Sequence, residues 1–286
     1  MTDIEFLAPG SLPELQTALS KATPKSKVLA GGTDLVIAIH ENRSKPDLII
    51  DLSGVRELNF IKLEQGHIHI GAMTTFTRLS EDDTIRKYIP CLAEAAAGIG
   101  SNQIRNTATI GGNIGNASPA GDAIPALIAL GAVIKIMDCT GRTEGKTVDE
   151  IITGPGQTGI RYNQVITEIA CQVPGPAYRS TFVKVGSRTT VTIAKLNMAL
   201  VLKYDPDSHI ISDARLGLGA IGGKAFRDSR AESTLNGQKA DKRLARVLGE
   251  ELCTTVQKAI PGRYSLPYKK EAIKGLACNA WNNLFP

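Results

Sequence analysis

The stretch from Asn106 to Asp122 limits what this chain can fold into more than any other part of it. It holds four glycines, three asparagines, three hydroxyl-bearing residues and one acid, interspersed with small or apolar residues. Periodicity is weak from Ile104 to Asp122, which predicts an irregular loop. So many polar groups would lack hydrogen-bond partners in a core unless a polar ligand filled the space between them. Long loops inside compact domains are usually functional, so we expect a ligand here, with an empty loop as the alternative.

The chemistry of this stretch suits an extended ligand that carries phosphates, hydroxyl groups and a heterocycle. Backbone amides around Gly111 and Gly112 are suited to a diphosphate. The carboxylate of Asp122 is suited to a hydroxyl-rich ribityl or ribose group.

A second glycine-rich segment directly follows the apolar strand that we expect at 27–30. Gly31 and Gly32 let consecutive N–H groups turn to one side and form an anion nest, which a Cβ would obstruct. Thr33 adds a hydroxyl donor, and Asp34 can brace the turn. A tight turn without a ligand explains these residues equally well.

Two further motifs resemble nucleotide-binding loops but lack the context that such loops need. Gly217–Gly222 fits G-x-G-x-x-G after an apolar strand, yet the residues that follow are too polar for a crossover helix. Gly141–Thr147 has three residues between its glycines instead of four, and no helix is expected after it. We interpret the second motif as a hairpin turn.

Composition excludes several classes of protein. The chain has 286 residues, 42% hydrophobic and 21% charged, which is typical of about two globular domains. No apolar run approaches the roughly 18 residues of a membrane span, and the start Met1–Gly10 lacks a basic signal-peptide region. We therefore expect a cytoplasmic protein without a membrane span.

Cysteine spacing and charge narrow the choice further. Cys91, Cys139, Cys171, Cys253 and Cys278 lie far apart, so we expect no metal centre on this chain. The net charge is +5, and from Lys224 onward 12 basic residues face 6 acidic ones. A solvated helical surface is the favoured reading, with an acidic partner subunit as the alternative. No aromatic residues interleave the Lys and Arg residues of 227–246 for base stacking, so nucleic acid is not an expected partner.

The hydrophobic pattern mixes helices and antiparallel strands. Helices are expected at 11–22, 77–88, 91–97, 123–130, 244–252, 254–259 and 268–284. Strands are expected at 27–30, 46–51, 132–137, 148–152, 165–173, 180–185, 196–204 and 210–218, with a hairpin at 58–70 that turns at 64–66.

The two glycine-rich segments together resemble a known family. Ala30–Leu35, and Thr109–Ile114 with Ala117–Asp122, closely resemble the FAD-binding loops of the flavoprotein subunit of molybdenum hydroxylases. That family includes xanthine, nicotinate and carbon monoxide dehydrogenases. The resemblance spans nearly the whole chain, since Lys184–Lys195 is similar to the segment that opens the family's C-terminal domain.

The resemblance implies an α+β fold. A p-cresol-methylhydroxylase-type FAD-binding domain of two α/β subdomains, 1–55 and 56–175, would precede a C-terminal flavoprotein domain, 176–286. The last domain would be an antiparallel sheet with packed helices, and Pro174-Gly175-Pro176 marks the expected boundary.

The resemblance also implies which residues bind FAD. The segment from Lys27 to Leu35 would wrap the diphosphate, and Lys184 matches a lysine near the isoalloxazine, where a cation stabilises the anionic reduced flavin. Ile166 would touch the ring through its backbone. The implied residues are Lys27, Val28, Leu29, Ala30, Gly31, Gly32, Thr33, Asp34, Leu35, Thr109, Gly112, Asn113, Gly115, Asn116, Gly121, Asp122, Ile166 and Lys184. The family often has acids where this chain has Thr190 and Val191, so the resemblance implies no flavin contact at that position.

The implied activity is electron transfer within a complex. Substrate would be hydroxylated at a molybdopterin cofactor on a large subunit, and two [2Fe–2S] clusters on a small subunit would pass electrons to FAD on this chain. NAD is one acceptor that would take them onward, and no residue of this chain beyond the flavin would be catalytic. A stand-alone FAD-dependent oxidase or reductase is the alternative, and a non-enzymatic assembly subunit with empty loops is a third.

Overall fold

The computed structural model describes residues 4–286, which fall into two compact units whose segments alternate along the chain. The first unit holds the chain up to Arg78 together with Asn102–Ala117 and Ala132–Gln172. The second holds Leu79–Ser101, Ser118–Gly131 and Val173–Pro286. The division into 1–55, 56–175 and 176–286 stays a prediction. Within the described residues, no helix is both long and apolar enough to cross a membrane.

The first unit contains a small parallel sheet with the strand order β1–β3–β2. Its strands are β1 (Glu5–Leu7), β2 (Lys27–Leu29) and β3 (Leu48–Asp51). Helix α1 (Leu12–Ser20) begins as predicted, because Ser11 Oγ accepts a hydrogen bond from Glu14 N at 3.4 Å. Its buried Leu15 and Leu19 pack in one cluster with Leu48 and Ile50.

The larger sheet of this unit is a five-stranded antiparallel sheet in the order β4–β5–β10–β6–β7. Its strands are β4 (Ile61–Glu64), β5 (His67–Gly71), β6 (Val133–Asp138), β7 (Thr143–Thr147) and β10 (Gln164–Gln172). The predicted hairpin turn is confirmed, since Gln65 and Gly66 have φ of 49° and 75° between β4 and β5.

The sequence Gly141–Thr147 forms the turn and second strand of the β6–β7 hairpin, as expected. The strand expected at 148–152 is wrong, as is the expectation that no helix follows the turn, because α9 (Val148–Ile151) begins at once with Thr147 and Glu150 as a capping box. Two short strands, β8 (Ile152–Gly154) and β9 (Gln157–Thr158), come next and pair with each other.

The stretch predicted to be an irregular loop contains two helices, α6 (Asn102–Thr107) and α7 (Ile110–Asn116). Their low intrinsic propensity is overridden by local caps and by contacts with neighbouring backbone. The remaining elements of this part of the chain are α2 (Leu35–His40), η1 (Arg56–Leu58) and α3 (Phe76–Glu81).

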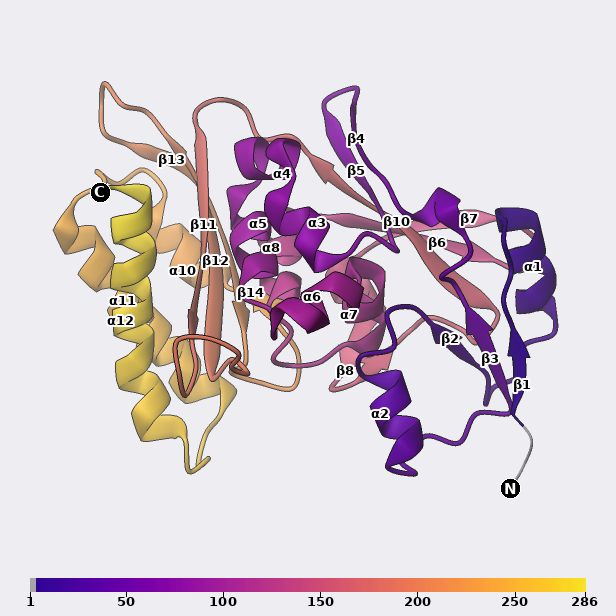
Figure 1. Ribbon diagram of the computed structural model, residues 1–286. Helices are drawn as coiled ribbons and strands as arrows, with labels where there is room; N and C mark the ends of the chain where they lie inside the picture. The colour runs from indigo at the N-terminus through magenta and orange to yellow at the C-terminus, as the bar shows by residue number, and fades with distance from the viewer. Residues whose placement is uncertain (1–3) are drawn as a thin grey trace. The chain divides into compact units, whose positions relative to one another are not determined.

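The second unit is built on a four-stranded antiparallel sheet in the order β11–β12–β13–β14 (Figure 1). The strands are β11 (Tyr178–Val185), β12 (Leu196–Tyr204), β13 (Ile211–Gly219) and β14 (Phe226–Arg227). The central strand β12 is buried on both faces apart from Lys203. This C-terminal sheet agrees with the predicted one.

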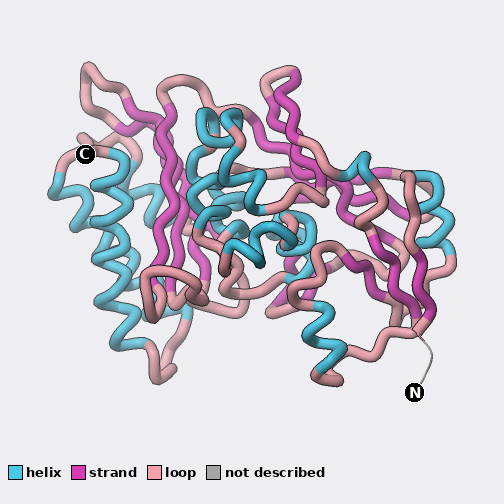
Figure 2. Tube along the Cα trace, in the orientation of Figure 1, coloured by secondary structure: helices cyan, strands magenta, loops and turns pink. Residues whose placement is uncertain are grey.

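Helices cover both faces of this sheet (Figure 1). Figure 2 shows the two long C-terminal helices as cyan tubes beside the magenta strands. They lie on one face with α10, and α5 and α8 lie against the sheet as well. The bounds are α4 (Asp83–Tyr88), α5 (Pro90–Ala97), α8 (Ala123–Ala129), α10 (Ser229–Leu235), α11 (Lys242–Ala259) and α12 (Leu266–Leu284).

The helices predicted at 77–88 and at 244–259 are divided differently in the structure. The helix expected at 77–88 is divided into α3 and α4, because Asp82 caps α4 by accepting hydrogen bonds from Thr84 N and Ile85 N. The helices expected at 244–252 and 254–259 form the single helix α11, whose buried residues follow one face without interruption.

Candidate flavin-binding site

The first glycine-rich segment connects β2 to α2 within the first unit. Gly32 has φ of +72°, a left-handed conformation that glycine adopts readily, and its carbonyl accepts from Val36 N at 3.1 Å. No described residue accepts a hydrogen bond from the backbone N–H groups of Gly31, Gly32, Thr33 and Asp34. The turn therefore presents four successive amide donors that the described protein does not use.

Contacts between backbones bring this segment against the α6–α7 region. A Cβ placed on Gly31 would lie 1.9 Å from the carbonyl oxygen of Thr107, and one on Gly112 would lie 3.4 Å from Ala30 Cβ. The two glycine-rich segments that the sequence analysis singled out are thus neighbours in space. The approach of two backbones by itself requires a glycine at position 31.

Helix α7 is fixed at its start by a second backbone approach. Gly111 N donates to Ala72 O at 2.9 Å, and a Cβ on Gly111 would lie 2.7 Å from that oxygen. Thr109 is the N-cap of α7, with its Oγ1 accepting from Gly112 N at 3.1 Å. The expected ligand residue Thr109 therefore uses its hydroxyl oxygen to hold the helix.

The remaining expected residues of α7 have free polar atoms or open surroundings. Asn113 Oδ1 is buried and has no hydrogen-bond partner among the described residues. A Cβ on Gly115 would meet no described atom within 4 Å, and both Gly115 and Asn116 are exposed. Helix α7 packs against β10, which carries the buried Ile166.

The other expected residues, Gly121, Asp122 and Lys184, belong to the second unit. Asp122 lies at the start of α8, and its Oδ2 is 2.6 Å from Lys184 Nζ on β11. Their side chains are only 7% and 12% exposed, respectively. The structure thus joins two residues 62 positions apart into one buried ion pair.

Lys184 is held by three acceptors. Besides Asp122, its ammonium group donates to Gly98 O at 2.6 Å and to Thr192 O at 3.2 Å. A lysine ammonium has three N–H donors, so all of them are engaged within the protein. Lys184 can therefore act on a neighbouring ligand through its positive charge without donating a further hydrogen bond.

Burial raises the pKa of Asp122 above its ordinary value, while the charge and hydrogen bond of Lys184 and a hydrogen bond from Asn197 act in the opposite direction. The Asn197 side chain donates through Nδ2 to Asp122 Oδ1 at 2.8 Å. Sequence reasoning missed Asn197. Its signal was present, because it is the polar residue within the apolar run Leu196–Leu202.

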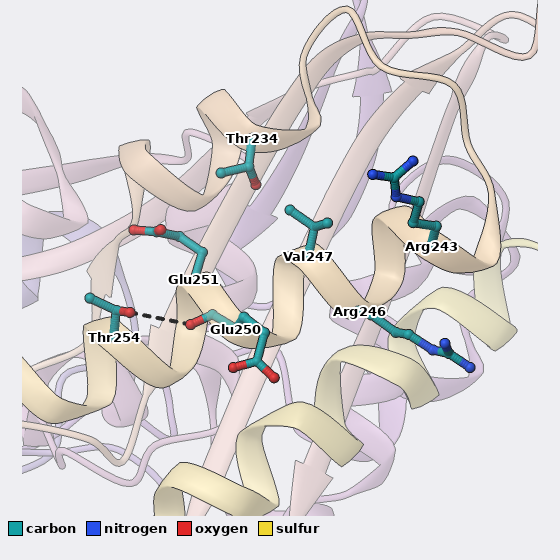
Figure 3. A pocket seen from close by; sticks show the side chains of 7 residues that line it. All are labelled: Thr234, Arg243, Arg246, Val247, Glu250, Glu251 and Thr254. Atoms are coloured by element: carbon teal, nitrogen blue, oxygen red, sulfur yellow. Dashed lines mark hydrogen bonds between the residues drawn. The ribbon is translucent and has the colours of Figure 1, made fainter.

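A separate pocket of about 410 Å³ lies on α10 and α11 (Figure 3). It is lined by side chains of both charges and none of the expected site residues: Thr234, Arg243, Arg246, Val247, Glu250, Glu251 and Thr254. Within the described residues, no group of three or more His, Cys, Asp or Glu side chains could hold a metal ion.

Comparison with protein families matches both parts of the chain. Residues 2–174 match the FAD binding domain in molybdopterin dehydrogenase. Residues 181–284 match the CO dehydrogenase flavoprotein C-terminal domain.

Individual relatives agree with these domains. The nicotinate dehydrogenase FAD-subunit of Eubacterium barkeri is 34% identical over 281 residues, covering 96% of this chain and 94% of the relative. The glyceraldehyde dehydrogenase medium chain of Sulfolobus acidocaldarius is 29% identical, covering 94% and 95%. Among solved structures, carbon monoxide dehydrogenase from Hydrogenophaga pseudoflava, in a form lacking the Mo-pyranopterin moiety, matches with a TM-score of 0.90 and 26% identity. That match covers 99% of this chain and 97% of the other.

The fold and the domain matches define a flavoprotein subunit of an oxidoreductase. The chain belongs to the FAD-binding subunits of the molybdenum hydroxylase family. The predicted family and the α+β fold with a C-terminal antiparallel sheet are confirmed.

The residues present fit FAD. The unused amide donors at 31–34 and the orphaned Asn113 Oδ1 supply polar groups for a phosphate-bearing and hydroxyl-bearing ligand. The open space beside Gly115 leaves room for close approach to α7.

Proposed function

We propose that this chain binds FAD through the predicted residues and relays electrons within a molybdenum hydroxylase complex. A molybdopterin-binding large subunit and a [2Fe–2S] small subunit are the proposed partners, and NAD is one proposed acceptor. The substrate is hydroxylated on the large subunit, so this chain contributes no nucleophile or general base to that step. FAD, when bound, can accept single electrons and release a pair.

The observation that carries this proposal is the contact between the two glycine-rich segments in the first unit. The approach of Gly31 to Thr107 places unused amide donors beside the α7 region that carries the orphaned Asn113. Backbone amides that face one side are suited to a diphosphate, because they add positive dipoles without a bulky side chain. Asn113 is then available to a neutral polar part of the ligand.

The buried Asp122–Lys184 pair supports a second part of the same proposal. Each Asp122 oxygen accepts one hydrogen bond within the protein and can accept another from a ligand hydroxyl. The Lys184 ammonium is held in place by three acceptors, so its charge has a fixed position. A fixed cation near a redox cofactor favours the more negative state of that cofactor.

The cytoplasm is the compartment that we propose. Among the described residues no disulfide joins any of the five cysteines, and Cys91, Cys171 and Cys253 are buried. Reduced, buried thiols are typical of proteins in a reducing compartment.

The test is reconstitution of the purified chain with FAD, FMN and riboflavin. We expect stoichiometric FAD with flavin absorption bands, and weaker binding of FMN and riboflavin because they lack the diphosphate bridge. Equal affinity for riboflavin would contradict the role of the amide donors at 31–34. A chain without flavin bands after reconstitution would contradict flavin binding altogether and favour the assembly subunit.

A further inference from the structure

The G-x-G-x-x-G sequence at the end of β13 has a packing role that the proposed function does not use. A Cβ on Gly217 would lie 2.1 Å from Pro125 O, and one on Gly219 would lie 2.2 Å from Asn197 Oδ1. The first two glycines therefore let the start of α8 and the Asn197 side chain lie directly on β13. The third, Gly222, has only Lys224 O nearby, at 3.7 Å.

The Asn197 side chain occupies this space, and only one of its two polar atoms forms a hydrogen bond with the described residues. It is opposite Gly219 in the β12–β13 register and is 1% exposed. Its Nδ2 donates to Asp122 Oδ1, whereas its Oδ1 has no hydrogen-bond partner among the described residues. A buried unpaired carbonyl destabilises a fold, so an apolar side chain would be the better choice here for stability alone.

We propose that Asn197, seated against Gly219, is a positioning residue that keeps Asp122 ionised and directed at Lys184, so that FAD meets one fixed charge arrangement. The inference rests on the proposed function, in which Asp122 and Lys184 contact FAD. The inference gives the glycine motif a packing role, in which Gly219 makes room for the Asn197 side chain, and not the binding of a second dinucleotide.

The electrostatics of Asp122 agree with this role. Burial raises the pKa of Asp122, and the hydrogen bond from Asn197 is one of the interactions that lower it. Loss of that bond therefore lets Asp122 take up a proton at higher pH.

Lys184 of β11 is the charged group that faces Asp122. The other charged side chains on elements packed against α8 are engaged elsewhere or exposed: Glu94 with Thr181 and Phe182, Asp213 with Arg215, Arg227 with Glu232, and Lys203 exposed.

The experiment measures FAD affinity by quenching of flavin fluorescence between about pH 5 and pH 9, a range that covers a raised carboxyl pKa. Asn197→Ala removes the hydrogen bond to Asp122, and Gly219→Ala adds a Cβ that would displace the Asn197 side chain. Gly222→Ala is the matched control in the same motif. We expect the first two to weaken FAD binding about tenfold near neutral pH, the loss typical of one hydrogen bond to a charged group. Their pH profiles should inflect at higher pH than the wild type, while Gly222→Ala follows the wild type.

Asn197→Asp supplies a distinct signature. When the new carboxyl is protonated it can donate to Asp122, so affinity at the acid end should approach that of the wild type. As pH rises, two adjacent carboxylates repel, and affinity should fall. A purely structural residue would give no such pH-dependent recovery.

Circular dichroism and thermal melting of the apo chains establish that each variant is folded, and Asn197→Ser replaces the alanine variant if that one is not. Wild-type affinity and pH profile in both Asn197→Ala and Gly219→Ala would overturn the positioning role, as would a loss of affinity without any change in profile. A wild-type chain that binds no FAD would instead contradict the proposed function.

Discussion

At the scale of single residues, Lys184 shows how one buried charge holds three segments of the fold together. Its ammonium group binds the end of α5 through Gly98, the start of α8 through Asp122 and the loop before β12 through Thr192. Asp122 is buried and depends on this partner. A buried carboxylate without its partner is strongly unfavourable, whereas removing both charges costs less.

The ion pair is therefore testable by a double-mutant cycle. We expect Lys184→Met to lower the free energy of unfolding by about 3 kcal/mol, because it leaves Asp122 buried without its cation. Asp122→Asn in the same chain should recover part of that loss. Urea unfolding of the apo proteins at pH 7 measures both, and strictly additive effects of the two changes would contradict the coupling.

A second cluster, on the five-stranded sheet, has the opposite electrostatic behaviour. Glu168 Oε1 lies 2.5 Å from His69 Nδ1 and 2.8 Å from Lys135 Nζ. Burial alone would raise the pKa of Glu168, but hydrogen bonds from Lys135 and His69 outweigh it and hold the pKa below the ordinary value of 4.5.

This shift predicts a pH-dependent stability. Because the pKa of Glu168 is lower in the folded chain than in the unfolded one, the stabilisation is complete above about pH 4.5 and is lost as pH falls through the folded value. Glu168→Gln should thus lower the free energy of unfolding by up to about 1 kcal/mol at pH 7. The two proteins should converge in acid. A difference that grows as pH falls would contradict this assignment; Glu64→Gln, on an exposed position of β4, is the control.

At the scale of elements, helices and strands with a regular hydrophobic pattern were predicted more accurately than helices rich in polar residues and glycine. Strand β12 was predicted with its observed bounds because its apolar run has no competing reading. Helices α6 and α7 were missed because Asn, Gly and Thr carry little helical signal. Their formation depends on contacts that are remote in sequence, such as Gly111 against Ala72.

The same limit applies to the candidate site. Local motifs singled out the two glycine-rich segments as candidate ligand-binding loops, since nests and turns are encoded by adjacent residues. The partnership of Asp122 with Asn197, 75 positions later, depends on how α8 lies on the sheet, and no local pattern contains it. The glycine motif at 217–222 was separated from the dinucleotide loops because no crossover helix was expected after it, but the close approach of Pro125 and Asn197 to its glycines became visible only in the fold.

One glycine from each glycine-rich segment, Gly115 and Gly31, offers a test at the element scale. Gly115→Ala should keep or raise the melting temperature of the apo chain, because alanine favours helix by up to about 1 kcal/mol and meets no described atom. If FAD approaches α7 there, the same variant should bind FAD more weakly. Unchanged affinity would remove Gly115 from the site.

Gly31→Ala is the comparison for that experiment. Its Cβ would overlap Thr107 O, so it should destabilise the apo chain as well as weaken FAD binding. Melting followed by circular dichroism and FAD titration of both variants separate a cofactor contact from a packing requirement.

At the scale of the whole molecule, the two family domains match residues 2–174 and 181–284 of the chain. The match to the nicotinate dehydrogenase FAD-subunit covers 96% of this chain and 94% of the relative. The basic excess after Lys224 lies in the part that matches the flavoprotein C-terminal domain. The two readings of this excess, a solvated helical surface or a face toward an acidic partner subunit, stay predictions.

The electron relay that we propose predicts a dependence on partner subunits. The isolated chain, loaded with FAD, should keep its flavin absorption when an N-heterocycle such as nicotinate or a purine is added, because it supplies no site for hydroxylation. Addition of the molybdopterin-binding and [2Fe–2S] subunits should then bleach the flavin band in the presence of the substrate that the large subunit accepts. Chemical reduction of the loaded chain with dithionite is the control that its flavin can be reduced. Bleaching by an N-heterocycle in the lone chain would contradict the relay and establish the stand-alone oxidase or reductase instead.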